Sequence, residues 1–212
     1  MNLSVKKTAL AVVVCSALGI VMPVMAAGNP TGSSATSLTM HVVGTITNST
    51  CNIRPYTTAG ADATTLNLGV MTQKTLASEV NFYLKPENGC SAGIIKDTND
   101  VNSLASTTAQ ITWESSGLTE HGISNMYGTA QNVHLELSPV SESGMAEINS
   151  SSSSVASKGI IKTGSQTVTY NKITDSSAVL PFKYSVKLAK DGTEAVTGGT
   201  FDTDITYTVA YI

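Results

Sequence analysis

The chain has 212 residues, of which 41% are hydrophobic and 13% are charged. This composition supplies enough apolar side chains for one ordinary core and too few charges for a disordered protein. The formal net charge is -3, and it becomes -5 when residues 1–26 are set aside, because 10 basic residues then face 15 acidic ones. Such an acidic chain is not suited to binding nucleic acid or an anionic membrane.

Residues 1–26 have the pattern of a secretory signal peptide. The basic pair Lys6 and Lys7 precedes an apolar run over residues 8–21, and Val24-Met25-Ala26 fits the small-residue cleavage pattern. The alternative is a membrane anchor, but the apolar run is shorter than the roughly 20 residues that a transmembrane helix needs. We therefore expect export and a mature chain that begins near Ala27.

Export also decides the state expected of the cysteines. Cys15 leaves with the signal peptide, so Cys51 and Cys90 remain in an oxidising compartment, where a disulfide is the expected state. On the chain-entropy account, closing a loop of about 40 residues stabilises a fold by roughly 4 kcal/mol. The alternatives are a metal site and a reactive thiol, which the sequence does not favour because it has no CxxC spacing and no histidine close by.

Short segments in which apolar and polar residues alternate follow one another along the mature chain. Alternation with a period of two indicates β-strands with one buried face. Turn residues separate the segments, and Asp191-Gly192 is typical of a hairpin. This pattern predicts an all-β antiparallel sandwich. Its predicted strands are residues 38–46, 66–69, 80–84, 109–113, 133–137, 166–170, 180–188 and 203–212.

Between these strands we expect exposed loops and no reaction centre. Residues 115–130 and 142–157 are predicted to be exposed loops, and the serine run 150–154 a solvated one. Trp113, in an apolar strand, is expected in the core rather than stacked on a sugar. Motifs for a nucleophile, a phosphate loop or a dinucleotide are absent, and His41, His121 and His134 lack metal-ligand spacing. We therefore predict no enzyme activity, no metal and no cofactor.

The two ends of the mature chain carry its most regular strands. At the C-terminus, Ile205, Tyr207, Val209 and Tyr211 alternate up to Ile212, and near the N-terminus residues 38–46 alternate behind a Gly/Ser-rich leader. An apolar strand on a flexible leader is an aggregation hazard unless something receives it. We expect the N-terminal strand of one subunit to complete the sheet of the next. The alternative is an ordinary first strand that pairs within its own sheet.

The order and spacing of these features resemble the subunits of chaperone–usher fimbriae, the pilins, over essentially all of the mature chain. Residues 81–86 and 111–113 are similar in particular to the major subunits of adhesive fimbriae of enterotoxigenic enterobacteria. The motifs that carry the resemblance, besides the signal peptide and the two cysteines, are Val42-Val43-Gly44-Thr45-Ile46, Leu66-Asn67-Leu68-Gly69, Leu180-Pro181-Phe182 and the penultimate Tyr211.

The resemblance implies an incomplete immunoglobulin-like β-sandwich that lacks its last strand. It divides the chain into a signal peptide (1–26), an N-terminal extension (27–50) and a pilin domain (51–212). The extension is the donor strand, with Gly44 opposite a shallow pocket that admits no Cβ. The donor residues are Leu38, Met40, Val42, Gly44 and Ile46. The groove residues, which a chaperone also contacts, are Ile205, Tyr207, Val209, Tyr211 and Ile212.

The implied function is that of a structural subunit of a surface fimbria that supports cell adhesion. The subunit would pass through the periplasm with a chaperone, reach an outer-membrane usher and polymerise there by donor-strand exchange with copies of itself or other fimbrial subunits. Two alternatives remain open: a shaft subunit that itself binds host glycans, and a minor or terminating pilin.

Overall fold

The computed structural model describes residues 36–47, 52–71, 76–87, 108–175 and 178–212. Within these ranges every regular element is a β-strand, so the all-β prediction is confirmed. None of the described residues belongs to a helix long and apolar enough to cross a membrane. The expected signal peptide and both mature cysteines, Cys51 and Cys90, lie outside the described residues.

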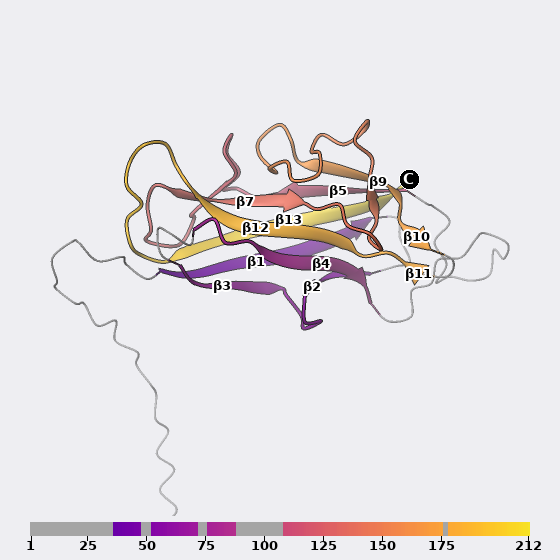
Figure 1. Cartoon of the computed structure of the whole chain (residues 1–212), viewed down its shortest axis with the longest axis horizontal. Helices are drawn as coiled ribbons and strands as arrows, with labels where there is room; N and C mark the ends of the chain where they lie inside the picture. The colour runs from indigo at the N-terminus through magenta and orange to yellow at the C-terminus, as the bar shows by residue number, and fades with distance from the viewer. Residues whose placement is uncertain (1–35, 48–51, 72–75, 88–107, 176–177) are drawn as a thin grey trace, which may run out of the picture. The chain divides into compact units, whose positions relative to one another are not determined.

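The strands form two main sheets (Figure 1). The six-stranded sheet has the order β3-β1-β13-β5-β9-β8, and the five-stranded sheet has the order β2-β4-β12-β7-β6. The six-stranded sheet consists of β1 (Thr36–Thr47), β3 (Thr65–Met71), β5 (Ala109–Glu114), β8 (Glu147–Ile148), β9 (Thr167–Lys172) and β13 (Phe201–Tyr211). The five-stranded sheet consists of β2 (Ile53–Thr57), β4 (Val80–Pro86), β6 (Ile123–Ser124), β7 (Val133–Pro139) and β12 (Phe182–Lys190). A short pair joins β10 (Thr174–Asp175) to β11 (Ala178–Val179).

Each of the eight predicted strands is a strand in the structure. Of the strands that the sequence does not predict, the longest is β2, which pairs with β4 at the edge of the five-stranded sheet. Pro55 lies in the middle of β2, and the missing N–H of proline is tolerated at a sheet edge. A short segment with a central proline carries too weak a pattern to be recognised before its partner is known.

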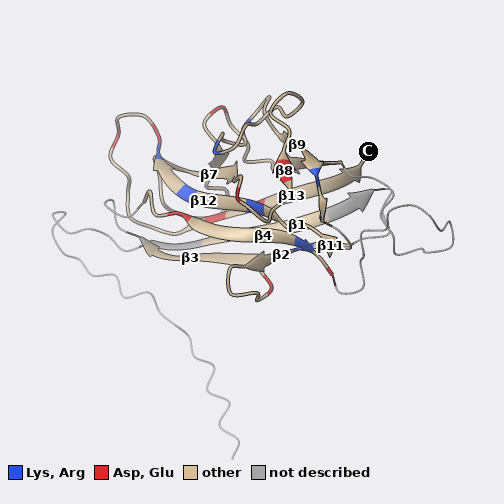
Figure 2. Cartoon of the chain, turned by 45° about the vertical axis from the view of Figure 1, so that its right-hand side comes forward, with Lys and Arg blue, Asp and Glu red and all other residues tan. Residues whose placement is uncertain are grey.

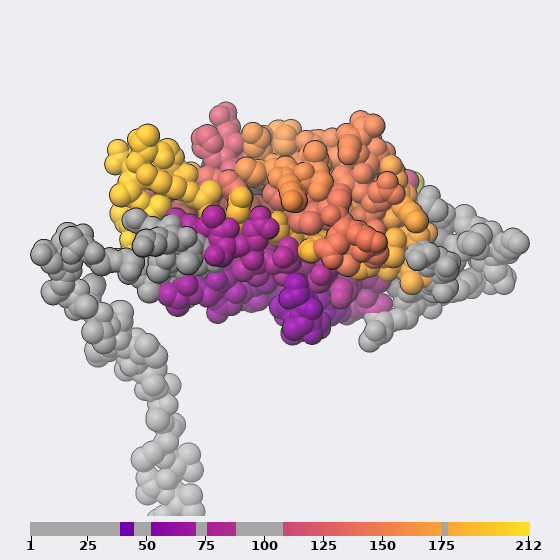
Figure 3. Space-filling model, in the orientation of Figure 1, coloured from indigo at the N-terminus to yellow at the C-terminus, as the bar shows by residue number. Residues whose placement is uncertain are grey.

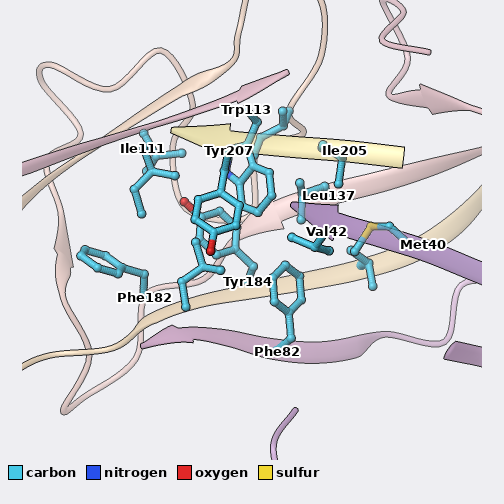
Figure 4. Packing of buried hydrophobic residues seen from close by; sticks show 14 of the residues in the cluster. Met40, Val42, Phe82, Ile111, Trp113, Leu137, Phe182, Tyr184, Ile205 and Tyr207 are labelled. Atoms are coloured by element: carbon cyan, nitrogen blue, oxygen red, sulfur yellow. The ribbon is translucent and has the colours of Figure 1, made fainter. Parts of the chain in front are cut away.

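The core lies between the two sheets and is built around aromatic side chains. Trp113 of β5 is fully buried, and its ring centroid lies 4.9 Å from that of Tyr184 and 6.3 Å from that of Phe82, both from the opposite sheet. Figure 4 shows these rings pointing into one interior with Tyr207. These contacts confirm that Trp113 is a core residue and place the two sheets face to face as a sandwich.

The prediction of two exposed loops is wrong for part of each segment. Ile123 in the first, and Ala146 and Val155 in the second, are at most 3% exposed and belong to the core. The serine run is not a merely solvated loop either, because it extends the ladder along β9. The Ser154 backbone N–H donates to the Thr167 carbonyl over 3.0 Å, and the Ser153 hydroxyl accepts the Thr169 N–H over 2.8 Å. Hydroxyl groups thus cover a sheet edge that would otherwise be open to pairing.

The buried tyrosines make the fold sensitive to alkaline pH. Burial raises the pKa of Tyr170, Tyr184 and Tyr207 above the ordinary value of 10.0. Above that value the unfolded chain releases protons that the folded chain keeps, so stability is full below about pH 10 and falls above it by about 1.4 kcal/mol per pH unit for each tyrosine. We expect phenolate absorbance of these side chains to appear together with the loss of β-sheet circular dichroism. Ionisation of these three tyrosines near pH 10, in a chain that keeps its β-sheet circular dichroism, would contradict this prediction.

Candidate functional site: the strand position beside β13

The C-terminal strand β13 presents one face to the core. Its alternate residues Phe201, Thr203, Ile205, Tyr207 and Val209 are at most 2% exposed, as the period of two requires. On one side β13 pairs with β5 in antiparallel register, with Tyr207 opposite Trp113. The predicted groove residues Ile205, Tyr207 and Val209 therefore share one inward row. Tyr211 is only partly buried, and Ile212 is 58% exposed.

On its other side β13 pairs in parallel with β1 of the same chain. Figure 1 shows the indigo β1 beside the yellow β13, between β13 and β3. The register places Met40 opposite Thr203, Val42 opposite Ile205 and Gly44 opposite Tyr207. The strand position that the resemblance assigns to a neighbouring subunit is thus occupied here by the chain's own N-terminal strand, and the sheet contains one parallel pair within an otherwise antiparallel sandwich.

The inward side chains of β1 are part of the core. Met40 and Val42 are both 0% exposed, and Figure 4 shows Val42 beside Leu137 in the interior that Ile205 also faces. Two other predicted donor residues lie in the same backbone register, since Leu38 is paired with Phe201 and Ile46 with Val209. The side chains of Leu38 and Ile46 lie outside what the structure describes.

Gly44 lies over the ring of Tyr207. A Cβ added to Gly44 would come closer than 3.0 Å to the Cζ, Cε2 and hydroxyl oxygen of that ring, a distance that real Cβ atoms essentially never show. The tyrosine hydroxyl in turn donates a hydrogen bond of 2.8 Å to the backbone carbonyl of Ile53 in β2. The ring therefore spans from β13 to the opposite sheet directly beneath β1.

The two halves of β1 are held differently. Residues 36–41 pair with β3, residues 38–41 also pair with β13, and Val42 donates its N–H to the Thr64 carbonyl over 2.9 Å. On the outer face His41 reinforces this half, with Nδ1 3.3 Å from the Thr65 hydroxyl and Nε2 3.7 Å from Asp202. From Val43 to Thr47, β13 is the only strand paired with β1 among the described residues.

The last residues of β13 are held on the β5 side. Tyr211 is paired with Ala109, the Ile212 N–H donates to the Thr108 carbonyl over 3.1 Å, and the Thr108 hydroxyl donates to the Ile212 carbonyl. The register of β1 ends at Ala210, so these two predicted chaperone-contact residues lie beyond the strand that fills the groove. The contact with a chaperone remains a prediction.

Other clusters of polar residues serve the fold. His134 is 6% exposed, and its Nδ1 lies 2.5 Å from Asp191, which ties β7 to the segment that follows β12. No group of three residues among those described could hold a metal ion. Figure 2 shows that Lys and Arg occur on several strands, and Figure 3 shows a continuous surface over the core in the view of Figure 1.

Comparison with known proteins shows to which family the chain belongs. No family model matches the chain. The K99 fimbrial protein of Escherichia coli is 30% identical over 192 residues, which cover 86% of this chain and 91% of that protein. The F107 fimbrial protein of Escherichia coli is 32% identical over 117 residues, which cover 53% of this chain and 61% of that protein. The family that the sequence predicts is confirmed: the chain belongs to the fimbrial proteins.

Proposed function

We propose that this chain is a structural subunit of a surface fimbria and that it polymerises by exchange of β1 between neighbouring copies. The observation that carries the proposal is the position of an N-terminal strand inside a sheet, with Met40 and Val42 fully buried against the core. Exchange of one identical element between protomers is an established route to assembly at low cost. The neighbour's β1 would restore the same buried contacts, so the sheet would remain complete.

The energetics favour a groove that is always filled. Full burial of Met40 and Val42 stabilises by about 2 kcal/mol each, and each ladder hydrogen bond adds about 1 kcal/mol net. A subunit whose own β1 has left would expose Ile205 and Val209 until another strand enters. A periplasmic chaperone that covers β13 before delivery to an outer-membrane usher would meet this need, and the polymer would then lie at the cell surface.

Mixing two complementary variants tests the exchange. Val42→Asp prevents β1 from acting as a donor strand but leaves the groove beside β13 intact. Ile205→Asp prevents the groove from accepting a strand but leaves β1 intact. In both variants docking would bury an unpaired charge in the core, which is strongly unfavourable. We expect neither variant to polymerise alone and the mixture to form a one-to-one complex, seen by size-exclusion chromatography with light scattering. The wild-type chain should form longer polymers.

The matched control is Val43→Asp, which changes the neighbouring residue of β1 on its outward face, where Val43 is 57% exposed. This variant should polymerise as the wild type does. If wild-type subunits stay monomeric at high concentration and the two complementary variants form no complex, exchange of β1 is not the mode of assembly.

A second candidate function is recognition of a neutral host glycan along the shaft. The observation that favours it is a hollow of about 560 Å³ beside β13, lined by the exposed Tyr127 together with Glu114, Gln166 and Asp204. A hydrogen bond to Asp204 raises the pKa of the Tyr127 hydroxyl, and the exposed ring offers a face on which a sugar can stack. The carboxylate and amide groups offer partners for sugar hydroxyls. None of the described residues that line this hollow is Lys or Arg, so they offer no positive charge to pair with an anionic sugar.

Binding to an array of neutral and sialylated glycans tests this candidate. Tyr127→Ala should weaken binding of a neutral glycan by about tenfold or more, the amount expected when an aromatic stacking contact is lost. Tyr83→Ala, on the five-stranded sheet, is the matched control and should leave binding unchanged. Equal binding by all three proteins, or binding to sialylated glycans alone, would exclude this hollow as the site.

A further inference from the structure

Residues 125–130, here called the Tyr127 loop, lie between β6 and β7 and carry Tyr127, whose side chain is 61% exposed. An exposed loop is ordinarily mobile, and a mobile side chain loses conformational entropy when it binds a ligand. The contacts of this loop are those of a fixed element, because its backbone is hydrogen-bonded to residues 200 and 202 at the start of β13.

The side chain of Asn125 is the centre of these contacts. Its amide oxygen accepts the N–H of Gly128 over 3.0 Å and the N–H of Asp202 over 2.8 Å. Its amide nitrogen donates to the carbonyl of Ala130 over 2.8 Å and to the carbonyl of Thr200 over 3.0 Å. An asparagine amide offers two donor hydrogens and an oxygen with two lone pairs, so its whole capacity is used. One side chain thus ties the two ends of the loop to each other and to β13.

The backbone of the loop is fastened at two further places. The N–H groups of Met126 and Tyr127 both donate to the Asp202 carbonyl over 3.0 Å. The hydroxyl of Thr200 accepts the Thr129 N–H, and the hydroxyl of Thr129 accepts the Thr200 N–H, each over 3.1 Å. The ring of Tyr127 therefore projects from a base that is bound on both sides of it.

Strand β13 carries both the anchor of the loop and part of the wall of the hollow. Asp202, which holds the loop through its N–H and its carbonyl, is two residues from Asp204. Asp204 lines the hollow and is hydrogen-bonded to the Tyr127 hydroxyl. A loop that is held before a ligand arrives loses less conformational entropy on binding than a mobile loop does.

We propose that Asn125 is the positioning residue of the hollow beside β13, where it holds the Tyr127 loop in the shape that presents the ring to a neutral sugar. Asn125 is not among the described residues that line the hollow, so it acts through the loop rather than by touching the sugar. This inference rests on the second proposed function, recognition of a neutral glycan. It adds that affinity for the glycan depends on a side chain outside the hollow.

Hydrogen exchange of the mature chain tests the fastening of the loop without any glycan. Asn125→Ala should make the amides of the Tyr127 loop exchange at least about tenfold faster, because four hydrogen bonds are lost. The amides of β7 and β12 report whether the variant is folded. The matched control is Asn149→Ala, since Asn149 also accepts a backbone N–H, that of Ser151 over 3.0 Å, but in a different loop. This control should leave exchange of the Tyr127 loop unchanged.

The array of neutral glycans then tests whether the fastening serves recognition. Asn125→Ala should weaken binding of the neutral glycans by about three- to tenfold, the cost of ordering a side chain that is no longer held. The double variant Asn125→Ala with Tyr127→Ala should bind no more weakly than Tyr127→Ala alone, because Asn125 acts through the ring. A general effect on stability would instead add to the effect of Tyr127→Ala.

Gly128→Ala tests the same geometry while Asn125 is kept. A Cβ added to Gly128 would overlap the backbone carbonyl oxygen of Thr200, so the loop must move away from β13. We expect faster exchange of the loop amides and weaker binding of the neutral glycans, as in Asn125→Ala. This variant provides the test if Asn125→Ala does not fold.

The inference and the function on which it rests fail separately. If the wild type binds no neutral glycan but Asn125→Ala frees the loop, the recognition function is overturned, and Asn125 remains the residue that holds the loop. If the wild type and Asn125→Ala bind a neutral glycan equally well, only the positioning role of Asn125 is overturned. Unchanged exchange of the loop in both Asn125→Ala and Gly128→Ala, while β7 and β12 stay protected, would also overturn that role.

Discussion

Deletion of residues 27–47 is expected to leave a chain that does not fold by itself. The deletion removes β1 from the interior of the six-stranded sheet and with it the fully buried Met40 and Val42. It also separates β3 from the sheet, because among the described residues β3 is paired with β1 alone. Two buried side chains at about 2 kcal/mol each, together with a ladder at about 1 kcal/mol per bond, are comparable to the roughly 5–15 kcal/mol that typically holds a domain together.

A synthetic peptide with the sequence of residues 36–47 should restore the fold of the truncated chain. The complex should show a cooperative thermal transition and resistance to protease, whereas the truncated chain alone should show neither. The matched control is the same peptide with Gly44→Arg, which cannot lie over Tyr207. A monomeric truncated chain that unfolds cooperatively and resists protease without any peptide would show that β1 is not needed to complete the sandwich.

Replacing both mature cysteines by serine is expected to cost about 4 kcal/mol of stability, since the disulfide would close a loop of about 40 residues. The described residues next to them support this pairing. Ile53 is paired with Pro86, and Glu87 donates its N–H to the Asn52 carbonyl over 2.8 Å. The segments that lead to Cys51 and Cys90 therefore run side by side. The carbonyl that anchors Tyr207 belongs to Ile53, so loss of the disulfide should also weaken the register of β1.

Intact mass under non-reducing conditions would show whether the disulfide is present. Denaturant unfolding with and without reductant would measure its contribution to stability. The double variant should unfold at a lower denaturant concentration than the oxidised wild type, with a larger m-value, because the unfolded chain without the crosslink is less compact and exposes more surface. The single variants Cys51→Ser and Cys90→Ser are the matched controls and should each be about as unstable as the double variant. Two free thiols in the native mature protein would refute the disulfide.

Much of the fold could be predicted because strand patterns are local. A period of two is visible within a few residues, which is why all eight predicted strands are found in the structure. The strand β2 escaped prediction because Pro55 interrupts its pattern and only its edge position tolerates the proline. The serine run was predicted as solvated because its role depends on Thr167 and Thr169 of a distant strand.

The sequence by itself determined that this protein is an all-β fimbrial subunit, that β1 and β13 each have one apolar face, and that Trp113 belongs to the core. Only the tertiary structure decided which strand lies beside β13, in which direction it runs, and that Tyr207 fills the space above which Gly44 lies. The physical reason is that alternation reports whether a face is buried, whereas pairing depends on complementary shapes from residues far apart in the chain.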